Sequence, residues 1–404
     1  MSFRKVTKYS KVTEDTEVTK VTKVTLLDLL KKCPDVSNLI FSASRKIFIL
    51  RQTSIEMKKM IKIANIKLVI GINDYYNGRK LLEKLNKLNL WCTVIELRLI
   101  DIKLGTISMW AEVEALRVNS TLQKLYLRDN DVEADGVRAI AEALRVNSTL
   151  QALGLHENNM GADGARAIAK TLCVNSTLVE LDIEWNNIGA VGGWAIANAF
   201  SVNNTLQYLG LAGNFIGVVS AKAIAEKLRV NSTLHTLTFG NNDVGPYGAQ
   251  AFASMLRVNS TLRKLDLSSN RMCADGVRVI AEALSVNNTL QYLYLGGNLM
   301  GPDGAQAIGS MLRVNSTLQK LSFADNYVGN DGAQSIAHAL RNNSTLQELK
   351  LWNNSVGADG ARAIAEALCV NSTLQSLDLE WNSIGDDGVR ALRNSWNRRG
   401  TLNI

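Results

Sequence analysis

The chain has 404 residues, of which 46% are hydrophobic and 20% are charged, and its formal net charge is +8 at pH 7. This composition is typical of a globular protein with a continuous core and argues against a disordered chain. The first residues, MSFRKVTKYSKV, lack the apolar segment of a signal peptide. No stretch approaches the ~20 apolar residues of a membrane span, so we expect no such span.

The positive charge is concentrated near the N-terminus. Residues 1–90 hold 19 Lys and Arg against 8 Asp and Glu, a net +11, whereas residues 91–404 hold 26 against 29, a net −3. Residues 1–25 consist largely of Lys, Val and Thr, which predicts a disordered basic tail, with an edge strand as the alternative. The tail lacks interleaved aromatics and any RNA-binding motif, so nucleic acid is not the expected partner.

Residues 26–90 predict an irregular N-terminal cap made of degenerate repeats. Residues 36–44 and Leu68–Ile70 fit short strands, and helices are expected near Leu26 and Arg79. The segment Gly71–Lys80 superficially resembles a phosphate-binding loop. Six residues separate its glycines where four are required, and Arg follows the second glycine, so we reject a nucleotide site.

The five cysteines are widely separated and include no Cys-x-x-Cys pair. This argues against a disulfide framework or a zinc site and favours a reducing compartment. We therefore expect the protein in the cytoplasm, with the nucleus as the alternative, and we expect no metal and no cofactor.

A 28-residue period organises the remainder of the chain. An Asn recurs at this spacing from Asn119 to Asn371, and the next step falls on Arg399. Ten regular units therefore fill 119–398, a degenerate unit occupies 91–118 and a partial unit occupies 399–404. Self-similarity at such a period predicts a solenoid over residues 91–404.

Each unit begins with a predicted strand. In the first regular unit, Leu125 and Leu127 alternate with polar residues, which is typical of a strand with one buried face. A second Asn follows at a fixed offset, and a buried Asn can bond the backbone of its own turn and of the next turn. This predicts a structural ladder of Asn130, Asn158, Asn186, Asn214, Asn242, Asn270, Asn298, Asn326, Asn354 and Asn382.

A predicted amphipathic helix follows each strand. Asp135 is the expected N-cap of the first one. Arg138 and Glu142, four residues apart, are expected to form an exposed pair. Apolar residues at i, i+3, i+4 and i+7 spacing form the face expected to be buried, namely Val137, Ile140, Ala141 and Leu144.

The recurring Val-Asn-Ser-Thr-Leu segment contains a sequon for N-linked sugar. It stands where each helix must turn into the next strand. Asn tolerates the left-handed conformation that ends helices, and Ser and Thr can bond local backbone. We interpret the segment as a helix-to-strand corner and the sequon as its by-product, with a glycosylated secreted protein as the alternative.

The pattern Leu-x-x-Leu-x-Leu-x-x-Asn followed by an Ala-rich helix resembles the leucine-rich repeat of the ribonuclease-inhibitor type. Repeat domains of nucleotide-binding leucine-rich-repeat receptors and of the Ran GTPase activator belong to the same type. The expected fold is an α/β solenoid in the form of a horseshoe. Its parallel strands, ~4.8 Å apart, lie on the concave side because the helices need 8–10 Å each.

Recognition should be encoded at the outward strand positions and the turns after them, because these positions differ between units. Exposed Trp beside acidic residues predicts two aromatic–acidic patches, one around Trp185 and one around Trp352 and Trp381. In the alternative, the Trp rings only cover the corner of the next unit. The candidate partner-binding residues are Tyr126, Arg128, His156, Glu184, Trp185, Tyr292, Tyr294, Lys350, Trp352, Asp378, Glu380 and Trp381.

No catalytic constellation is predicted. The three histidines, His156, His235 and His338, lie units apart and cannot converge with one another. The sequence therefore predicts a non-enzymatic scaffold that binds a protein or peptide, basic if the acidic patches are used. Resemblance to the Ran activator gives the alternative of a GTPase regulator, although the acidic C-terminal tail of that family is absent here.

Overall fold

The computed structural model describes residues 39–41, 48–50, 66–71, 94–101, 105, 113, 116–396 and 400–404. The chain divides into two units, Met1–Ile61 and Lys62–Ile404. In the first unit, β1 (Leu39–Phe41) pairs with β2 (Phe48–Leu50) in antiparallel fashion. The tail expected at 1–25 lies outside the described residues. Of the cap expected at 26–90, only β1, β2 and β3 are described, so its boundaries stay predictions.

The second unit contains one sheet of 13 strands, ordered along the chain and parallel throughout. The strands are β3 (Ile66–Gly71), β4 (Val94–Ile100), β5 (Lys124–Tyr126), β6 (Ala152–Gly154), β7 (Glu180–Asp182), β8 (Tyr208–Gly210), β9 (Thr236–Thr238), β10 (Lys264–Asp266), β11 (Tyr292–Tyr294), β12 (Lys320–Ser322), β13 (Glu348–Lys350), β14 (Ser376–Asp378) and β15 (Thr401–Asn403).

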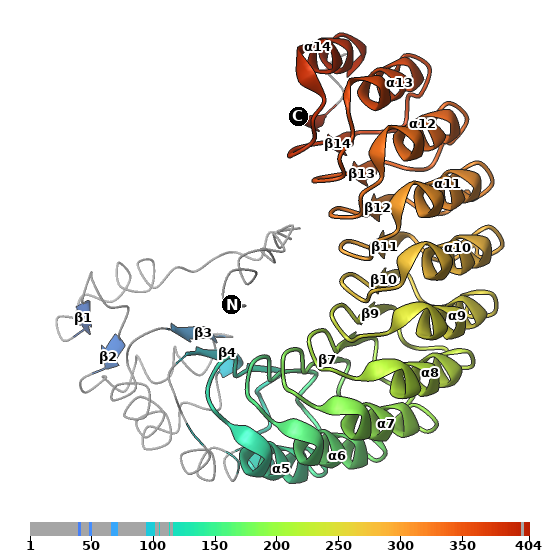
Figure 1. The fold of residues 1–404 in the computed structure, drawn as a ribbon. Coiled ribbons are helices and arrows are strands. Elements are labelled where there is room, and N and C mark those ends of the chain that lie inside the picture. The colour runs from blue at the N-terminus through green and yellow to red at the C-terminus, as the bar shows by residue number, and fades with distance from the viewer. Residues whose placement is uncertain are drawn as a thin grey trace, which may run out of the picture. The chain divides into compact units, whose positions relative to one another are not determined.

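A helix follows each strand from β5 to β14. Within this unit the strands line the inner curve and the helices the outer curve (Figure 1), which confirms the predicted α/β solenoid. The helices are α5 (Glu133–Leu144), α6 (Gly161–Leu172), α7 (Gly189–Ala199), α8 (Gly217–Leu228), α9 (Gly245–Leu256), α10 (Cys273–Leu284), α11 (Gly301–Leu312), α12 (Gly329–Leu340), α13 (Ala358–Leu368) and α14 (Gly385–Trp396).

The core lies between the sheet and the helices. Leu125, Leu153 and Leu181 stand at equivalent positions in register on β5, β6 and β7, so each leucine packs on its counterpart in the next unit. Val137 and Ile140 of α5 are fully buried, as the helical spacing predicts. Each unit thus buries its apolar face against its neighbours, which is why the units are stable only as a stack.

The start of each helix differs from the prediction. Helix α5 begins at Glu133, so Asp135 lies inside the first turn and is not the N-cap, and no side chain caps this helix. The backbone N–H of Glu133 instead donates to the carbonyl oxygen of Asn158, 3.0 Å away in the next unit. The neighbouring unit thus satisfies the first of the amides that a helix start leaves without an intrahelical partner.

The predicted pair between Arg138 and Glu142 is also wrong. Arg138 binds Asp135 at 2.7 Å, and Glu142 instead faces Arg145 at 3.5 Å. The cause is the earlier helix start, which places the Asp135 carboxylate one turn before Arg138. Acidic residues in a first turn also interact favourably with the helix dipole.

The predicted Asn ladder is confirmed. The side-chain amide of Asn242 donates to the carbonyl oxygens of Leu211 (2.9 Å) and Gly240 (3.2 Å), and its Oδ1 accepts from the backbone N–H of Asn214 at 3.1 Å. Equivalent bonds recur along the stack, and Asn130 to Asn354 in this ladder are at most 1% exposed. The ladder therefore joins each turn to the one before it.

The corner Asn forms a second ladder that the sequence did not predict. Asn315 follows α11, and its Nδ2 donates to the carbonyl oxygen of Leu284 at 2.8 Å, at the end of the neighbouring helix α10. Its Oδ1 accepts from the backbone N–H groups of Thr317 (3.1 Å) and Leu318 (2.8 Å). The expected left-handed conformation is wrong, since none of the corner Asn residues described has a positive φ.

These contacts explain the repeated sequon. Eight of the corner Asn residues are between 3% and 7% exposed. Their Nδ2 groups donate hydrogen bonds to backbone carbonyl oxygens of the neighbouring repeat. A sugar on Nδ2 would remove such a donor from a folded unit. The corner interpretation is therefore confirmed, with the side chain rather than the backbone conformation making the turn.

Candidate functional site

The predicted binding residues lie on the concave surface, where the outward side chains of the strands are half-buried. They form two groups, separated by β8, β9 and β10. Tyr126, Arg128, His156, Glu184 and Trp185 lie on β5 to β7 and the turns after them. The second group, on β11 to β14 and their turns, consists of Tyr292, Tyr294, Lys350, Trp352, Asp378, Glu380 and Trp381.

In the first group, hydrogen bonds join side chains that lie two repeats apart. The strand between them carries a glycine at the crossing point. The hydroxyl of Tyr126 on β5 donates to Oε1 of Glu180 on β7, 3.0 Å away. Gly154 on the intervening strand leaves the room, because a Cβ there would lie 2.5 Å from the Tyr126 ring. Arg98 on β4 stacks 4.4 Å from the centre of the same ring. Burial, followed by the charge of Glu180, raises the pKa of Tyr126.

Glu184 makes a second bridge of the same kind. Its Oε1 accepts a short hydrogen bond from the hydroxyl of Thr238, 54 residues further along the chain. The glycine between them is Gly210, where a Cβ would lie 2.8 Å from Asp182 Oδ1 and 3.1 Å from Glu184 Cγ. Strand glycines thus serve here as openings through which polar side chains connect alternate repeats.

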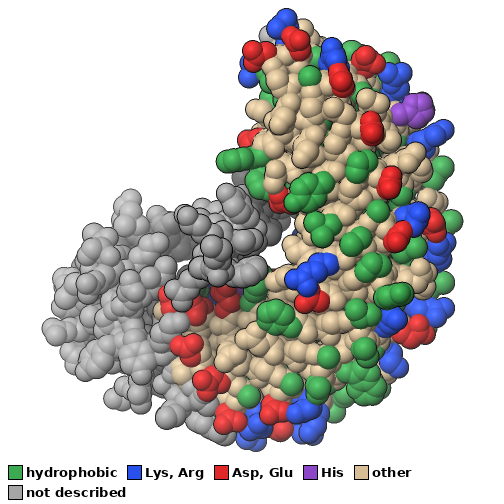
Figure 2. Space-filling model, viewed as in Figure 1, with side chains coloured by type: hydrophobic (Ala, Val, Ile, Leu, Met, Phe, Trp, Pro, Cys, Tyr) green, Lys and Arg blue, Asp and Glu red, His purple; other side chains and the backbone are tan. Residues whose placement is uncertain are grey.

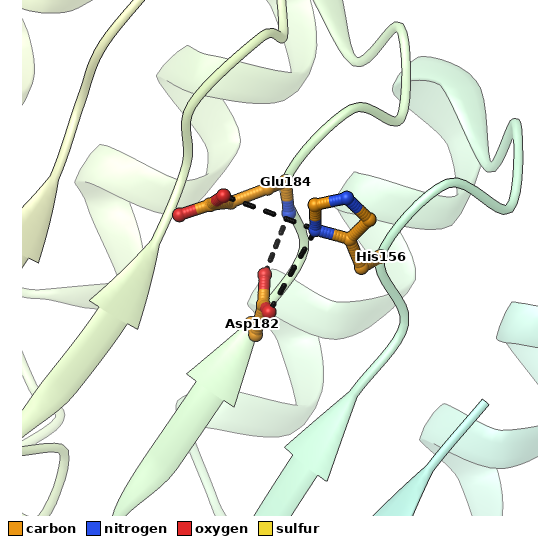
Figure 3. Close-up of side chains that lie close together, drawn as sticks. All are labelled: His156, Asp182 and Glu184. Carbon is orange, nitrogen blue, oxygen red and sulfur yellow. Dashed lines mark hydrogen bonds and ion pairs between the residues drawn. The ribbon is translucent and has the colours of Figure 1, made fainter. Parts of the chain in front are cut away.

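His156, Asp182 and Glu184 converge in the first group (Figure 3). His156 Nδ1 lies 3.9 Å from Asp182 Oδ2 and 3.8 Å from Glu184 Oε2. Burial lowers the pKa of His156, although Asp182 opposes the change. Burial first, and then the charge of Asp182, raises the pKa of Glu184 to about 7.

The sequence predicted only that the three histidines do not converge with one another. It did not predict that His156 would meet acidic residues of the next repeat. The signal for it lies in the 28-residue period, because His156 and Glu184 differ by one period and so lie side by side on the surface. His235 and His338 are exposed. Arg128, also in the first group, forms an exposed ion pair with Glu157 at 3.3 Å.

The second group contains an exposed aromatic pair. Trp352 and Trp381 come from adjacent units, and their ring centres lie 6.3 Å apart in an edge-to-face arrangement. This confirms that they are neighbours. Trp381 is 72% exposed, whereas Trp352 is half-buried. Asp378 and Glu380 stand beside them, with Asp378 Oδ1 accepting the backbone N–H of Glu380 at 3.1 Å.

Lysine side chains form ion pairs and cation–ring contacts around Tyr292, Tyr294 and Lys350 of the second group. Glu348 binds Lys320 at 3.1 Å and Lys350 at 3.2 Å. Partial burial would raise the pKa of Glu348, but the hydrogen bonds from these two lysines outweigh it and lower the pKa. Tyr292 faces Lys320, and Tyr294 faces Lys264 on β10, at 5.7 and 5.3 Å from the ring centres.

Trp185 differs from the C-terminal pair. Its ring lies directly on Gly213 in the next unit, where a Cβ would fall within 2.4 Å of the ring, and it is 38% exposed. This contact favours the covering role for Trp185. On the face shown in Figure 2, charged side chains occur along the outer curve and also on the inner part of the face, interspersed with hydrophobic side chains.

A family model described as leucine-rich repeat matches nine segments of the chain, which are residues 118–141, 146–169, 174–197, 230–253, 258–281, 286–309, 314–337, 342–365 and 370–392. The chain belongs to the leucine-rich repeat family. Proteins with these repeats generally serve in protein–protein interaction. The ribonuclease-inhibitor type of the repeat stays a prediction.

Three solved structures illustrate what this chain is similar to. An internalin from Listeria monocytogenes has 16% identity and a TM-score of 0.48, covering 81% of this chain and 93% of its own. The actin-binding site 2 of leiomodin-1 has 20% identity and a TM-score of 0.33, over 38% of this chain and 88% of its own. The tropomodulin C-terminal domain of Caenorhabditis elegans has 13% identity and a TM-score of 0.34, over 37% and 92%.

The comparison with curated proteins gives no match. Within the described part of the chain, no helix combines the length and the apolar character needed to cross a bilayer.

Proposed function

We propose that this leucine-rich repeat chain is a non-enzymatic recognition scaffold that binds a protein partner on its concave surface. The observation that carries the proposal is the Trp352–Trp381 pair. Trp381 exposes 72% of its surface, whereas the leucines of the strands in the regular repeats are buried. A large exposed ring is unfavourable in water and is a preferred anchor at protein interfaces.

The chemistry around the pair favours a basic partner. Asp378 is half-buried and Glu380 is exposed, and they lie three residues and one residue before Trp381 in the chain. A Lys or Arg side chain that packs on Trp381 would gain a cation–π contact together with attraction to these carboxylates. A segment of a protein surface that combines apolar and basic side chains therefore fits this end of the concave surface.

Partner capture from a cell extract tests the proposal. The wild-type chain is compared with the double variant Trp352→Ala/Trp381→Ala and with Trp194→Ala, a matched control. Trp194 lies on α7 and is 53% exposed, so its loss removes a comparable ring from the convex side. Thermal unfolding of the three proteins checks that they are folded.

We expect the wild type and Trp194→Ala to retain the partner. The double variant should lose it, because truncation of an interface Trp costs about 2 kcal/mol or more, which is at least tenfold in affinity for each ring. A partner that the folded double variant retains with unchanged affinity would contradict the proposal.

A further inference from the structure

The cluster of His156, Asp182 and Glu184 has donor atoms arranged around one point. One ligand atom from each residue lies within 4.8 Å of the others. Zinc binds His nitrogen and carboxylate oxygen at about 2.0–2.2 Å, so tetrahedral donors stand roughly 3.4 Å apart. The distances from His156 Nδ1, 3.9 Å to Asp182 and 3.8 Å to Glu184, exceed this value by a few tenths of an ångström.

Neighbouring groups orient the two carboxylates. Asp182 uses Oδ1 to accept the backbone N–H of Glu184 at 3.0 Å, which leaves Oδ2 facing the imidazole. Glu184 uses Oε1 to accept from Thr238, which leaves Oε2 facing the imidazole. Such hydrogen bonds from a second layer of residues fix the direction of metal ligands in known sites.

The imidazole ring has a carboxylate on each side. Its Nδ1 faces the two carboxylates, while its Nε2 lies 3.7 Å from Glu157 Oε2 on the opposite side. A carboxylate behind the second ring nitrogen is the usual partner of a metal-binding His. Glu157 lies beyond hydrogen-bond distance of this nitrogen, so the positioning residue of the cluster is Thr238, which hydrogen-bonds Glu184.

We infer that His156, Asp182 and Glu184 bind a divalent transition-metal ion of the zinc type on the concave surface. Two neighbouring carboxylates repel each other, and an ion between them would offset that repulsion. The mixed nitrogen and oxygen donors favour zinc over Mg²⁺ and Ca²⁺, which prefer oxygen ligands alone. Three protein ligands leave a fourth position for water or for a donor from a partner.

The inference does not rest on the proposed function. The cluster lies on β7 and the turns after β6 and β7, whereas the Trp352–Trp381 pair lies after β13 and β14. Metal binding can therefore be measured on the isolated chain, and its failure would leave the recognition proposal unaffected.

Imidazole nitrogen NMR of the full chain tests the inference. The chain has only three histidines, so the spectrum is simple, and the variant His156→Gln assigns the His156 signals. We expect one equivalent of Zn²⁺ to shift the Nδ1 signal of His156 and to leave His235 and His338 unchanged. Mg²⁺ at the same concentration should shift none of them. This readout also distinguishes the site from zinc bound to the cysteines.

Isothermal titration with Zn²⁺ gives a second measurement. His156→Gln and Glu184→Gln should lose this site, and Thr238→Val should weaken it roughly tenfold because it removes an orienting bond. His235→Gln, an exposed matched control, should bind as the wild type does. An unshifted His156 signal at saturating Zn²⁺, or equal affinity in the wild type and Glu184→Gln, would overturn the inference.

Discussion

At the scale of single residues, two Asn ladders connect the repeats of this chain. One lies at the end of each strand, and the other lies at each helix-to-strand corner. Both bind backbone groups that neither the sheet nor the helices satisfy, and burial makes such bonds costly to lose. The polar side chains that recur most regularly in this sequence are therefore structural.

The corner ladder predicts a stability effect for Asn315→Ala. The change leaves the carbonyl of Leu284 and the N–H of Leu318 without a partner inside the protein. We expect the free energy of unfolding to fall by about 2 kcal/mol or more, measured by urea denaturation. Ser316→Ala in the same corner is the control, because Ser316 is exposed and should change stability little. Equal stability of both variants would contradict the role of the ladder.

The ion pairs of Glu348 predict a pH dependence. Its pKa is lowered in the folded chain by Lys320 and Lys350, so its contribution to stability is present above the ordinary glutamate pKa and is lost as the pH falls through the folded value. Glu348→Gln should be less stable than the wild type at pH 7 by up to about 1 kcal/mol. This difference should shrink as the pH falls below the ordinary glutamate pKa. A difference that stays constant over this range would contradict the assignment.

The sequence predicted the strand ladder but not the action of the corner Asn. Asn130 and its equivalents follow a recognisable strand, so their surroundings could be inferred. The corner Asn follows a helix, and the sequence does not show whether its backbone or its side chain makes the turn. The cluster at His156 was missed for a related reason, because its members belong to different repeats.

At the scale of the elements, the helices pack closely because glycine occupies their inner face. In α12, a Cβ added to Gly332 would lie 2.7 Å from Ala305 Cβ on α11 and 2.6 Å from Val328 Cγ1. The sequence could not place the helix starts, because their first amide is satisfied by the carbonyl of a residue in the next repeat.

Close packing predicts that Gly332→Ala destabilises the chain although Ala favours helices. Overpacking of this kind costs about 1–3 kcal/mol, which exceeds the gain of about 1 kcal/mol in helix propensity. Thermal unfolding should show a lower midpoint for this variant. Gln334→Ala on the exposed face of the same helix should leave the midpoint unchanged or raise it. A stabilised Gly332→Ala would show that the helices can separate without cost.

At the scale of the whole solenoid, the fold of the regular repeats that the structure describes between residues 116 and 396 could be predicted almost completely. A single period in the sequence determines strand order, parallel pairing and the side on which the helices lie. The outward strand positions could be identified as well. What could not be predicted is how they interact, because bonds such as Tyr126 to Glu180 pass over an intervening strand and depend on where a glycine leaves space.

The central claim is that a protein partner contacts the C-terminal part of the concave surface. Site-specific photo-crosslinking tests it most directly, with a photoreactive side chain placed at Glu380 beside the Trp pair or at Trp194 on the convex side. We predict that the captured partner crosslinks from position 380 and not from position 194. Crosslinking from 194 alone would place the contact on the helices and contradict the claim.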